Sequence, residues 1–444
     1  MILCRKPMNN GPLIIQRTLR LRGRLIYRDR RGVRIPNLSR PWSALSAARL
    51  VKEASIQDDV LACSPPPDGV PWLLVGQLLL VLPAALWTWK VGTFIREFRS
   101  APASPPKNLC VDRSLSSLAS RLERLDTSES IFQRRLLYMP YFPPGSRTQE
   151  LDPADPMLRG LTVRKLSFAP VDGSPRLDGL LLTPSSLGSR PPEGLIYYLQ
   201  GNAGNTLARL PKFRELLFPA AATDPPTLGL FALSPRGYWS SGGPLPFPLT
   251  ALTPPGHRLS QRGLLRDYGR VLAELGQRSE LKNVPVWLHG HSLGGAVAAQ
   301  LLAEMCKAEG GTAHIAGLIL ENPLPSVPHM VKVLYPSKWL PYHYLGGFAR
   351  DRWDSSQALH SIHHHIPLLV IQSEHDELVP PLLTRGLYDD ACASRLSDPT
   401  NNPTHQPITQ HAVIPHALHD SAFSKARYRL TVHRFISRTM PHKK

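Results

Sequence analysis

A serine flanked by glycines is the first feature of this chain that could do chemistry. Gly290, Ser292 and Gly294 lie in the stretch VWLHGHSLGG. A serine hydroxyl becomes a nucleophile when a neighbouring base removes its proton, and it then attacks a carbonyl carbon. Glycines two positions to either side permit the sharp strand-to-helix turn that exposes such a hydroxyl. Because this pattern also arises by chance in a chain of 444 residues, the surrounding elements must decide.

A nucleophilic serine of this kind needs an acid that orients its base, and the acid is expected between the serine and the histidine in the chain. Asp376 directly follows the apolar run IPLLVIQSEH, at the edge where enzymes built on parallel sheets place their sites. We therefore predict Asp376 as the acid. Glu374 and Glu377 are nearby alternatives, Glu321 is a weaker one, and Asp376 could instead cap the following helix.

The base must be a histidine near the C-terminus, where the segment HAVIPHALHD offers His411, His416 and His419. His411 is expected to begin a strand. His419 falls in the loop before the last helix, next to Asp420 as a helix cap, so we predict His419 as the base and keep His416 as the alternative.

The negative charge that forms during acyl transfer needs two backbone N–H donors. One is expected from Leu293, the residue after the nucleophile, and the other from the loop after an upstream strand. That loop reads QGNAGN, and its glycines would let N–H groups turn inward, which makes Asn202 the second predicted donor. The alternative is that this loop is only a tight turn.

These residues need elements to position them, and the sequence from residue 161 onward alternates short apolar runs with helical patterns. We predict strands at residues 195–199, 228–233, 285–289, 315–321, 366–372 and 411–415. Strands that alternate with helices indicate a mainly parallel sheet with helices on both faces. Ser292 then occupies the turn between the strand at 285–289 and a helix that begins near Leu293.

The N-terminal part has a different character, and four domains are predicted. Residues 1–69 are predicted to form a basic, disordered tail, and residues 70–89 a transmembrane signal-anchor helix with the sequence VPWLLVGQLLLVLPAALWTW. Residues 90–150 are predicted to form a linker with a helix, and residues 151–444 the α/β domain that holds the candidate site. The span of 20 uncharged residues matches the thickness of a bilayer. This predicts a single-pass membrane protein, with an endomembrane location preferred and mitochondrial targeting by the Arg-rich start as the alternative.

The net charge of +19 does not indicate a nucleic-acid partner, because residues 1–50 alone hold eleven arginines and Lys6 against Asp29. No aromatic-interleaved basic motif of the kind found in nucleic-acid-binding proteins accompanies this basic tail, so no nucleic-acid binding is predicted.

Cysteine and histidine spacing predicts no metal site. The five cysteines are widely spaced and include no C-x-x-C, which excludes a zinc ribbon and a disulfide framework. His360 and the run His363–His365 have no regularly spaced Asp, Glu or Cys beside them, so they are interpreted as a solvated loop.

Several motifs together resemble a known family. QGNAGN, SPRGYWSS, GHSLGGAVA, ENPLPSVPHM, SEHDELVPP and HALHD occur in this order, and RRLLYMPYFPPGSR precedes them. The chain thereby resembles the α/β-hydrolase domain family related to fungal bud-emergence proteins. The resemblance implies an α/β-hydrolase fold with a small cap, often behind one N-terminal anchor helix, and a serine-hydrolase triad of Ser292, Asp376 and His419. Related members include acyl-protein thioesterases and lipid hydrolases.

The expected function is therefore a membrane-anchored serine hydrolase that cleaves an acyl ester or thioester, in a lipid or an acylated protein, through an acyl-enzyme and without any metal or organic cofactor. A short stretch with Trp339, Tyr342, Tyr344 and Phe348 could line an acyl pocket or simply pack a small cap. The alternatives are a peptidase-type serine hydrolase and a non-catalytic interaction protein built on the same fold.

Overall fold

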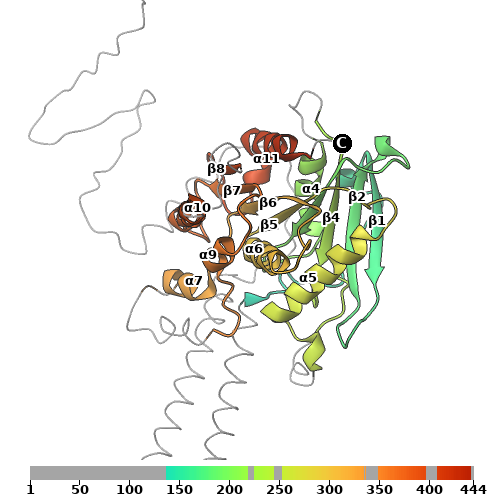
Figure 1. Cartoon of the computed structure of the whole chain (residues 1–444). Helices are drawn as coiled ribbons and strands as arrows, with labels where there is room; N and C mark the ends of the chain where they lie inside the picture. The colour runs from blue at the N-terminus through green and yellow to red at the C-terminus, as the bar shows by residue number, and fades with distance from the viewer. Residues whose placement is uncertain are drawn as a thin grey trace, which may run out of the picture. The chain divides into compact units, whose positions relative to one another are not determined.

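A computed structural model describes residues 137–218, 225–244, 253–334, 336, 349–396 and 408–441 (Figure 1). These residues belong to one compact unit, residues 108–444. The predicted tail at 1–69, the predicted membrane helix at 70–89, and the aromatic stretch around Trp339 lie outside the described residues. Within the described ranges, no helix combines the length and the apolar character that crossing a membrane requires.

The centre of the described part is an eight-stranded sheet with the order β1-β2-β4-β3-β5-β6-β7-β8. β2 is antiparallel to both β1 and β4, and the strands from β4 to β8 run parallel to one another. The predicted α/β-hydrolase fold, with its mainly parallel sheet, is confirmed. The strands are β1 Leu161–Phe168, β2 Leu177–Pro184, β3 Gly194–Leu199, β4 Leu228–Ser234, β5 Val286–His291, β6 Ile315–Glu321, β7 Leu368–Ser373 and β8 Thr409–Ile414.

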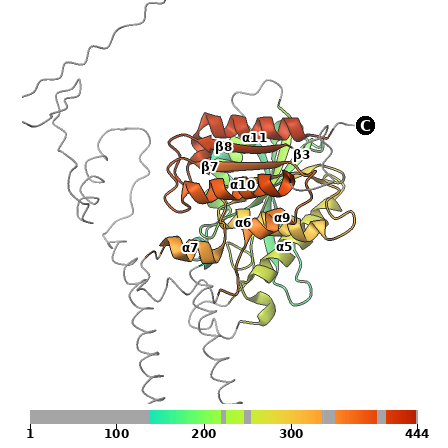
Figure 2. The same cartoon turned by 60° about the vertical axis from the view of Figure 1, so that its left-hand side comes forward.

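Helices cover both faces of the sheet, and two apolar cores fill the space beneath them. One core joins the sheet to α5, α6, α9 and α10, and the other joins it to α4 and α11. Figure 2 shows β7 and β8 between α10 and α11. The helices are α4 Leu210–Leu217, α5 Gln261–Gly276, α6 Leu293–Cys306, α7 Val327–Leu334, α9 Ser355–His360, α10 Pro381–Leu396 and α11 Ala426–Thr439.

β3 shows why the central strands are continuously apolar in sequence. Tyr197 faces the core under α5 and α6, and its neighbour Tyr198 faces the core under α4 and α11. Because both faces are covered, every residue of β3 is buried. The predicted strands at 195–199, 228–233, 285–289, 315–321, 366–372 and 411–415 each match an observed strand to within a few residues.

The segment before β1 packs against the same domain. Tyr138 is buried, its hydroxyl donates to Asp351 Oδ2 at 3.0 Å, and it accepts a hydrogen bond from Trp353 Nε1 at 3.0 Å. The N–H of Met139 donates to the carbonyl of Asn202 at 2.9 Å. Residues 137–150, which the sequence assigned to the linker, therefore pack with the sheet and helices that follow them.

Candidate active site

Ser292 lies at the turn between β5 and α6, and α6 begins at Leu293 as predicted. Its backbone has φ 55° and ψ −120°, in the left-handed region that non-glycine residues rarely adopt. The turn is held by two hydrogen bonds: the N–H of Ser292 donates to the carbonyl of Glu321 at 2.9 Å, and the N–H of Leu324 donates to the carbonyl of Ser292 at 3.0 Å. The neighbouring strand β6 thus fixes a strained serine, which is typical of a functional site.

The two glycines are required because the backbone packs too closely for a Cβ atom. A Cβ on Gly290 would lie 2.2 Å from the carbonyl oxygen of Gly294, and a Cβ on Gly294 would lie 2.1 Å from that of Leu199 in β3. Real Cβ contacts do not occur at such distances. The glycine spacing in the sequence therefore has a structural cause, the direct contact of α6 with the sheet.

Asp376 and His419 lie in contact at the carboxyl ends of β7 and β8. His419 Nδ1 is 2.9 Å from Asp376 Oδ1 and 2.8 Å from Oδ2, and both side chains are buried. The same carboxylate accepts the N–H groups of Leu378 at 2.9 Å and Val379 at 2.7 Å. A carboxylate that is fixed in this way holds the imidazole through Nδ1 and leaves Nε2 for proton transfer.

The alternative acids have other partners. Glu374 accepts the N–H of His416, Glu377 accepts the N–H of His419 at 2.9 Å, and Glu321 is bound to a buried lysine. The alternative bases are also placed elsewhere. His416 has an 82% exposed side chain, and His411 lies within β8, with its Nε2 3.0 Å from Gln372 Oε1. Among these candidates, the structure pairs Asp376 with His419.

Two residues that the sequence analysis missed hold the backbone of His419. His291 Nε2 donates to the carbonyl of His419 at 3.1 Å, and Asn322 Nδ2 donates to the same oxygen at 2.9 Å. Asn322 also bonds Ser373 at the end of β7. Burial, aided by the charge of Lys212, lowers the pKa of His291 well below its ordinary value, so this imidazole is neutral. The sequence held one indication of this role: His291 and Asn322 both lie close to the end of a predicted strand, where a site is expected.

A buried ion pair lies within the core at the same edge of the sheet. Lys212 Nζ in α4 lies 2.9 Å and 3.1 Å from the two carboxylate oxygens of Glu321 at the end of β6. The hydroxyl of Tyr428 donates to Glu321 at 2.8 Å, and His289 Nε2 lies 3.2 Å from the same carboxylate. All four side chains are essentially inaccessible to solvent.

The electrostatics keep this pair charged. Burial alone would raise the pKa of Glu321, but Lys212 and the neighbouring histidines outweigh it and lower that pKa well below its ordinary value. Burial alone would lower the pKa of Lys212, but the carboxylate of Glu321 outweighs it and raises that pKa. Burial also lowers the pKa of His289, which therefore stays neutral and donates to the carboxylate.

Hydrogen bonds to neighbouring segments hold the QGNAGN loop in place, through one of its backbone carbonyls and one of its side chains. The carbonyl of Asn202 accepts the N–H of Met139 at 2.9 Å and the hydroxyl of Tyr238 at 2.7 Å. Asn205 Nδ2 donates to the carbonyl of Ser146 at 2.8 Å. Within the described ranges, the N–H groups of Asn202 and Leu293 have no protein acceptor. The oxyanion-binding role predicted for them needs N–H groups without a protein acceptor.

The sequence of this chain is similar to those of several known proteins. The chain is 29% identical over 276 residues to the alpha/beta hydrolase domain-containing protein WAV2 of Arabidopsis thaliana, a match that covers 59% of this chain and 76% of that protein. It is 28% identical over 250 residues to protein bem46 of Schizosaccharomyces pombe, covering 56% and 72% of the two chains. The predicted family resemblance is confirmed.

A third relative of this chain is the lysophosphatidylserine lipase ABHD12 of Danio rerio. It is 34% identical over 146 residues, which cover 31% of this chain and 36% of that protein. No protein-family model matches the chain. The homologues of this chain therefore include a lipase as well as proteins named for the α/β-hydrolase domain.

The turn at Ser292 yields the first prediction. Gly290→Ala should destabilise the protein by about 2–4 kcal/mol, because the added methyl meets backbone that cannot move away. The matched control is Gly386→Ala within α10, where no atom lies within 4 Å of the new Cβ. This control should be neutral or more stable by about 0.5–1 kcal/mol. Urea denaturation measures both, and equal stability of the two variants would contradict the close contact.

The second prediction concerns the buried ion pair of Lys212 and Glu321. Lys212→Met and Glu321→Gln should each cost about 3–5 kcal/mol, because each leaves the other partner buried without its ion-pair partner. The double variant should lose clearly less than the sum of the two. Lys307→Met is the control, since its pairing with Glu304 is exposed and its removal should change stability by less than about 0.5 kcal/mol. Strictly additive losses in the double-mutant cycle would show that the pair is not coupled.

Proposed function

We propose that this α/β hydrolase is a serine hydrolase that cleaves an acyl ester or thioester, with Ser292 as nucleophile, His419 as base and Asp376 as the acid that orients it. The observation that carries the proposal is the buried contact between Asp376 and His419 at the sheet edge where Ser292 also lies. β5, β7 and β8 are parallel, so the loops after them meet at one edge.

The neighbour of Ser292 supports its closeness to the base. His291 contacts His419 directly, with 4.9 Å between ring centroids and a hydrogen bond to the carbonyl of His419. The residue before the nucleophile thus touches the residue proposed to activate it. This contact joins residues that are 128 positions apart in the chain.

The proposed reaction has two halves. His419 Nε2 takes the proton of Ser292 as the hydroxyl oxygen attacks the acyl carbon, and the N–H groups of Leu293 and Asn202 bind the oxyanion. His419 then gives this proton to the leaving alcohol or thiol. His419 then takes a proton from water, which attacks the acyl-enzyme, and the imidazolium returns that proton to the Ser292 oxygen as the acid leaves, which restores free Ser292. Asp376 stabilises the imidazolium in both halves, and no metal or organic cofactor takes part.

Exposed apolar side chains support an acyl substrate. Most of the large hydrophobic residues that are exposed within the described ranges lie near the proposed site in the chain or on the segment that bonds the QGNAGN loop: Leu378 and Leu382 follow Asp376, Leu418 precedes His419, and Tyr141 and Phe142 belong to that segment. The carbonyl of Phe142 accepts the N–H of Gly204 at 2.7 Å, and Leu418 directly precedes His419. In this proposal these side chains form an apolar rim near Ser292, and such a rim suits a fatty acyl chain better than a polar acid.

A lipid substrate or an acylated protein would fit this site. One relative is named as a lipase of lysophosphatidylserine, which supports a lipid class of substrate. The apolar segment at 70–89 supports anchoring at a membrane, where such substrates occur. We therefore place the proposed hydrolase at a membrane, with the catalytic domain outside the bilayer.

Labelling by a fluorophosphonate probe tests the nucleophile. The wild-type chain should react, and Ser292→Ala should lose all labelling, because only a serine with an activated hydroxyl attacks the probe. Ser356→Ala, on α9, is the matched control and should label as the wild type does. Absence of labelling in folded wild-type protein, or labelling that survives in Ser292→Ala, would refute the proposal.

The acyl specificity is tested with esters of different chain length. Leu382→Asp and Leu418→Asp should each lower kcat/KM for a long-chain ester roughly 10-fold or more, since a buried leucine contact is worth about 1.5–3 kcal/mol. Hydrolysis of an acetyl ester should change little. Leu396→Asp is the control, because Leu396 is also exposed but lies at the far end of α10. Equal losses on short and long esters would argue against an acyl-binding rim.

A further inference from the structure

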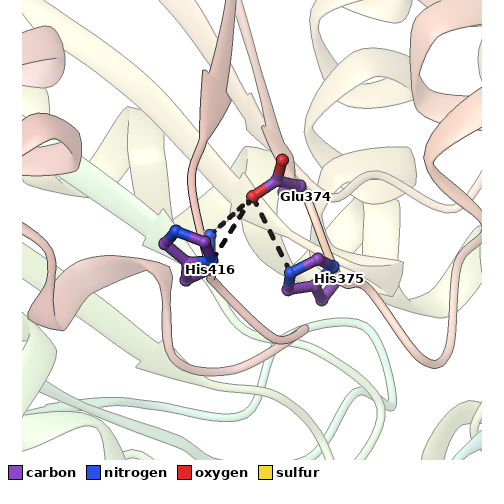
Figure 3. Close-up of side chains that lie close together, drawn as sticks. All are labelled: Glu374, His375 and His416. Carbon is purple, nitrogen blue, oxygen red and sulfur yellow. Dashed lines mark hydrogen bonds and ion pairs between the residues drawn. The ribbon is translucent and has the colours of Figure 1, made fainter. Parts of the chain in front are cut away.

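Three side chains converge on the surface next to the proposed acid and base. Glu374 and His375 follow β7, and His416 follows β8. Glu374 Oε2 lies 3.8 Å from His375 Nε2 and 3.8 Å from His416 Nδ1. Figure 3 shows the carboxylate facing both imidazole rings, whose centroids are 5.7 Å apart. In the described part of the chain, this is the only group of three or more such side chains whose ligand atoms all lie within 4.8 Å of one another.

The backbone holds this group in place. The N–H of His416 donates to Glu374 Oε2 at 2.9 Å, which fixes the carboxylate. The N–H of Glu374 donates to the carbonyl of Ile414 at 3.1 Å, and the N–H of His375 donates to that of Ala417 at 2.9 Å. His416 itself has φ 54°, a conformation that turns its side chain away from a regular strand path. The three side chains are thus presented together by two loops that are joined to each other.

The donor atoms suit one class of ion. Two imidazoles and one carboxylate are ligands of zinc and related transition metals, whereas calcium and magnesium prefer oxygen alone. Ligand atoms around a tetrahedral zinc ion lie about 3.3 Å apart, as follows from Zn–N and Zn–O distances of about 2.0–2.2 Å. The carboxylate lies 3.8 Å from each imidazole nitrogen, and all three ligand atoms lie within 4.8 Å of one another, so modest side-chain rotations bring them to this geometry. All three residues are exposed, which leaves room for water to complete the coordination.

We propose that Glu374, His375 and His416 form a binding site for a divalent transition-metal ion of the zinc class. Such an ion joins the loop that carries Asp376 to the loop that carries His419. It lies outside the proposed reaction, and its effect is to hold the two loops together and to stabilise the folded domain. The site is independent of whether Ser292 is a nucleophile.

Zinc titration of the full chain, freed of metal by chelation and without a histidine tag, tests the site. Calorimetry should show zinc binding, and excess zinc should raise the Tm by roughly 5 °C, as expected for ligand at about a hundred times its Kd. His375→Ala/His416→Ala should lose one bound zinc and most of the Tm shift, and Glu374→Gln should weaken binding about 10-fold or more.

A second pair of histidines provides the matched control. His363 and His365 are also exposed, and their ring centroids are 5.4 Å apart. His363→Ala/His365→Ala should bind zinc as the wild type does, and so should Ser292→Ala. The proposal is wrong if wild type binds no zinc at millimolar concentration, or if His375→Ala/His416→Ala keeps the wild-type stoichiometry and Tm shift.

Discussion

The direct contact between the start of α6 and the sheet is the constraint on which the rest of the site depends. At Gly294 no side chain can stand between the helix and the carbonyl of Leu199 in β3. This contact forces the turn after β5 to be sharp and places Ser292 in a left-handed conformation. The bond from its N–H to Glu321 then fixes the serine against β6. The strain is supported by the large apolar core that α6 shares with the sheet.

A polar layer beneath the site connects elements that are distant in sequence. Lys212 comes from α4, Glu321 from β6, and Tyr428 from α11, so one buried carboxylate joins three parts of the fold. His291 and Asn322 extend this layer to the loop of His419. Buried charges of this kind are costly unless each has its partners, which makes the layer specific to one arrangement of these elements.

The sequence predicted those features of the fold whose cause lies in a short stretch of neighbouring residues. Strands β3 to β8 were predictable because both of their faces are covered and their residues are therefore apolar. The positions of Ser292, Asp376 and His419 near strand ends were predictable because each follows a recognisable strand, and their catalytic roles stay proposals. β1 and β2 were both missed. β1 lies at the sheet edge, where its charged residues are exposed and interrupt the apolar pattern. β2 is buried, but Asp178 and Gly179 leave it only the short apolar run Leu180–Leu182. The roles of Lys212, His291 and Asn322 were hidden because their partners are far away in the chain.

The hydrogen bond from Met139 to Asn202 connects the segment before β1 to the QGNAGN loop. The segment that enters the domain bonds the loop proposed to bind the oxyanion, and Tyr138 is locked beside Asp351 and Trp353. The folded domain therefore does not begin at residue 151. A fragment that begins there lacks the donor that completes the QGNAGN loop, so the smallest piece with an intact site must include Tyr138. The segment at residues 137–150 is thus a structural part of the proposed active site.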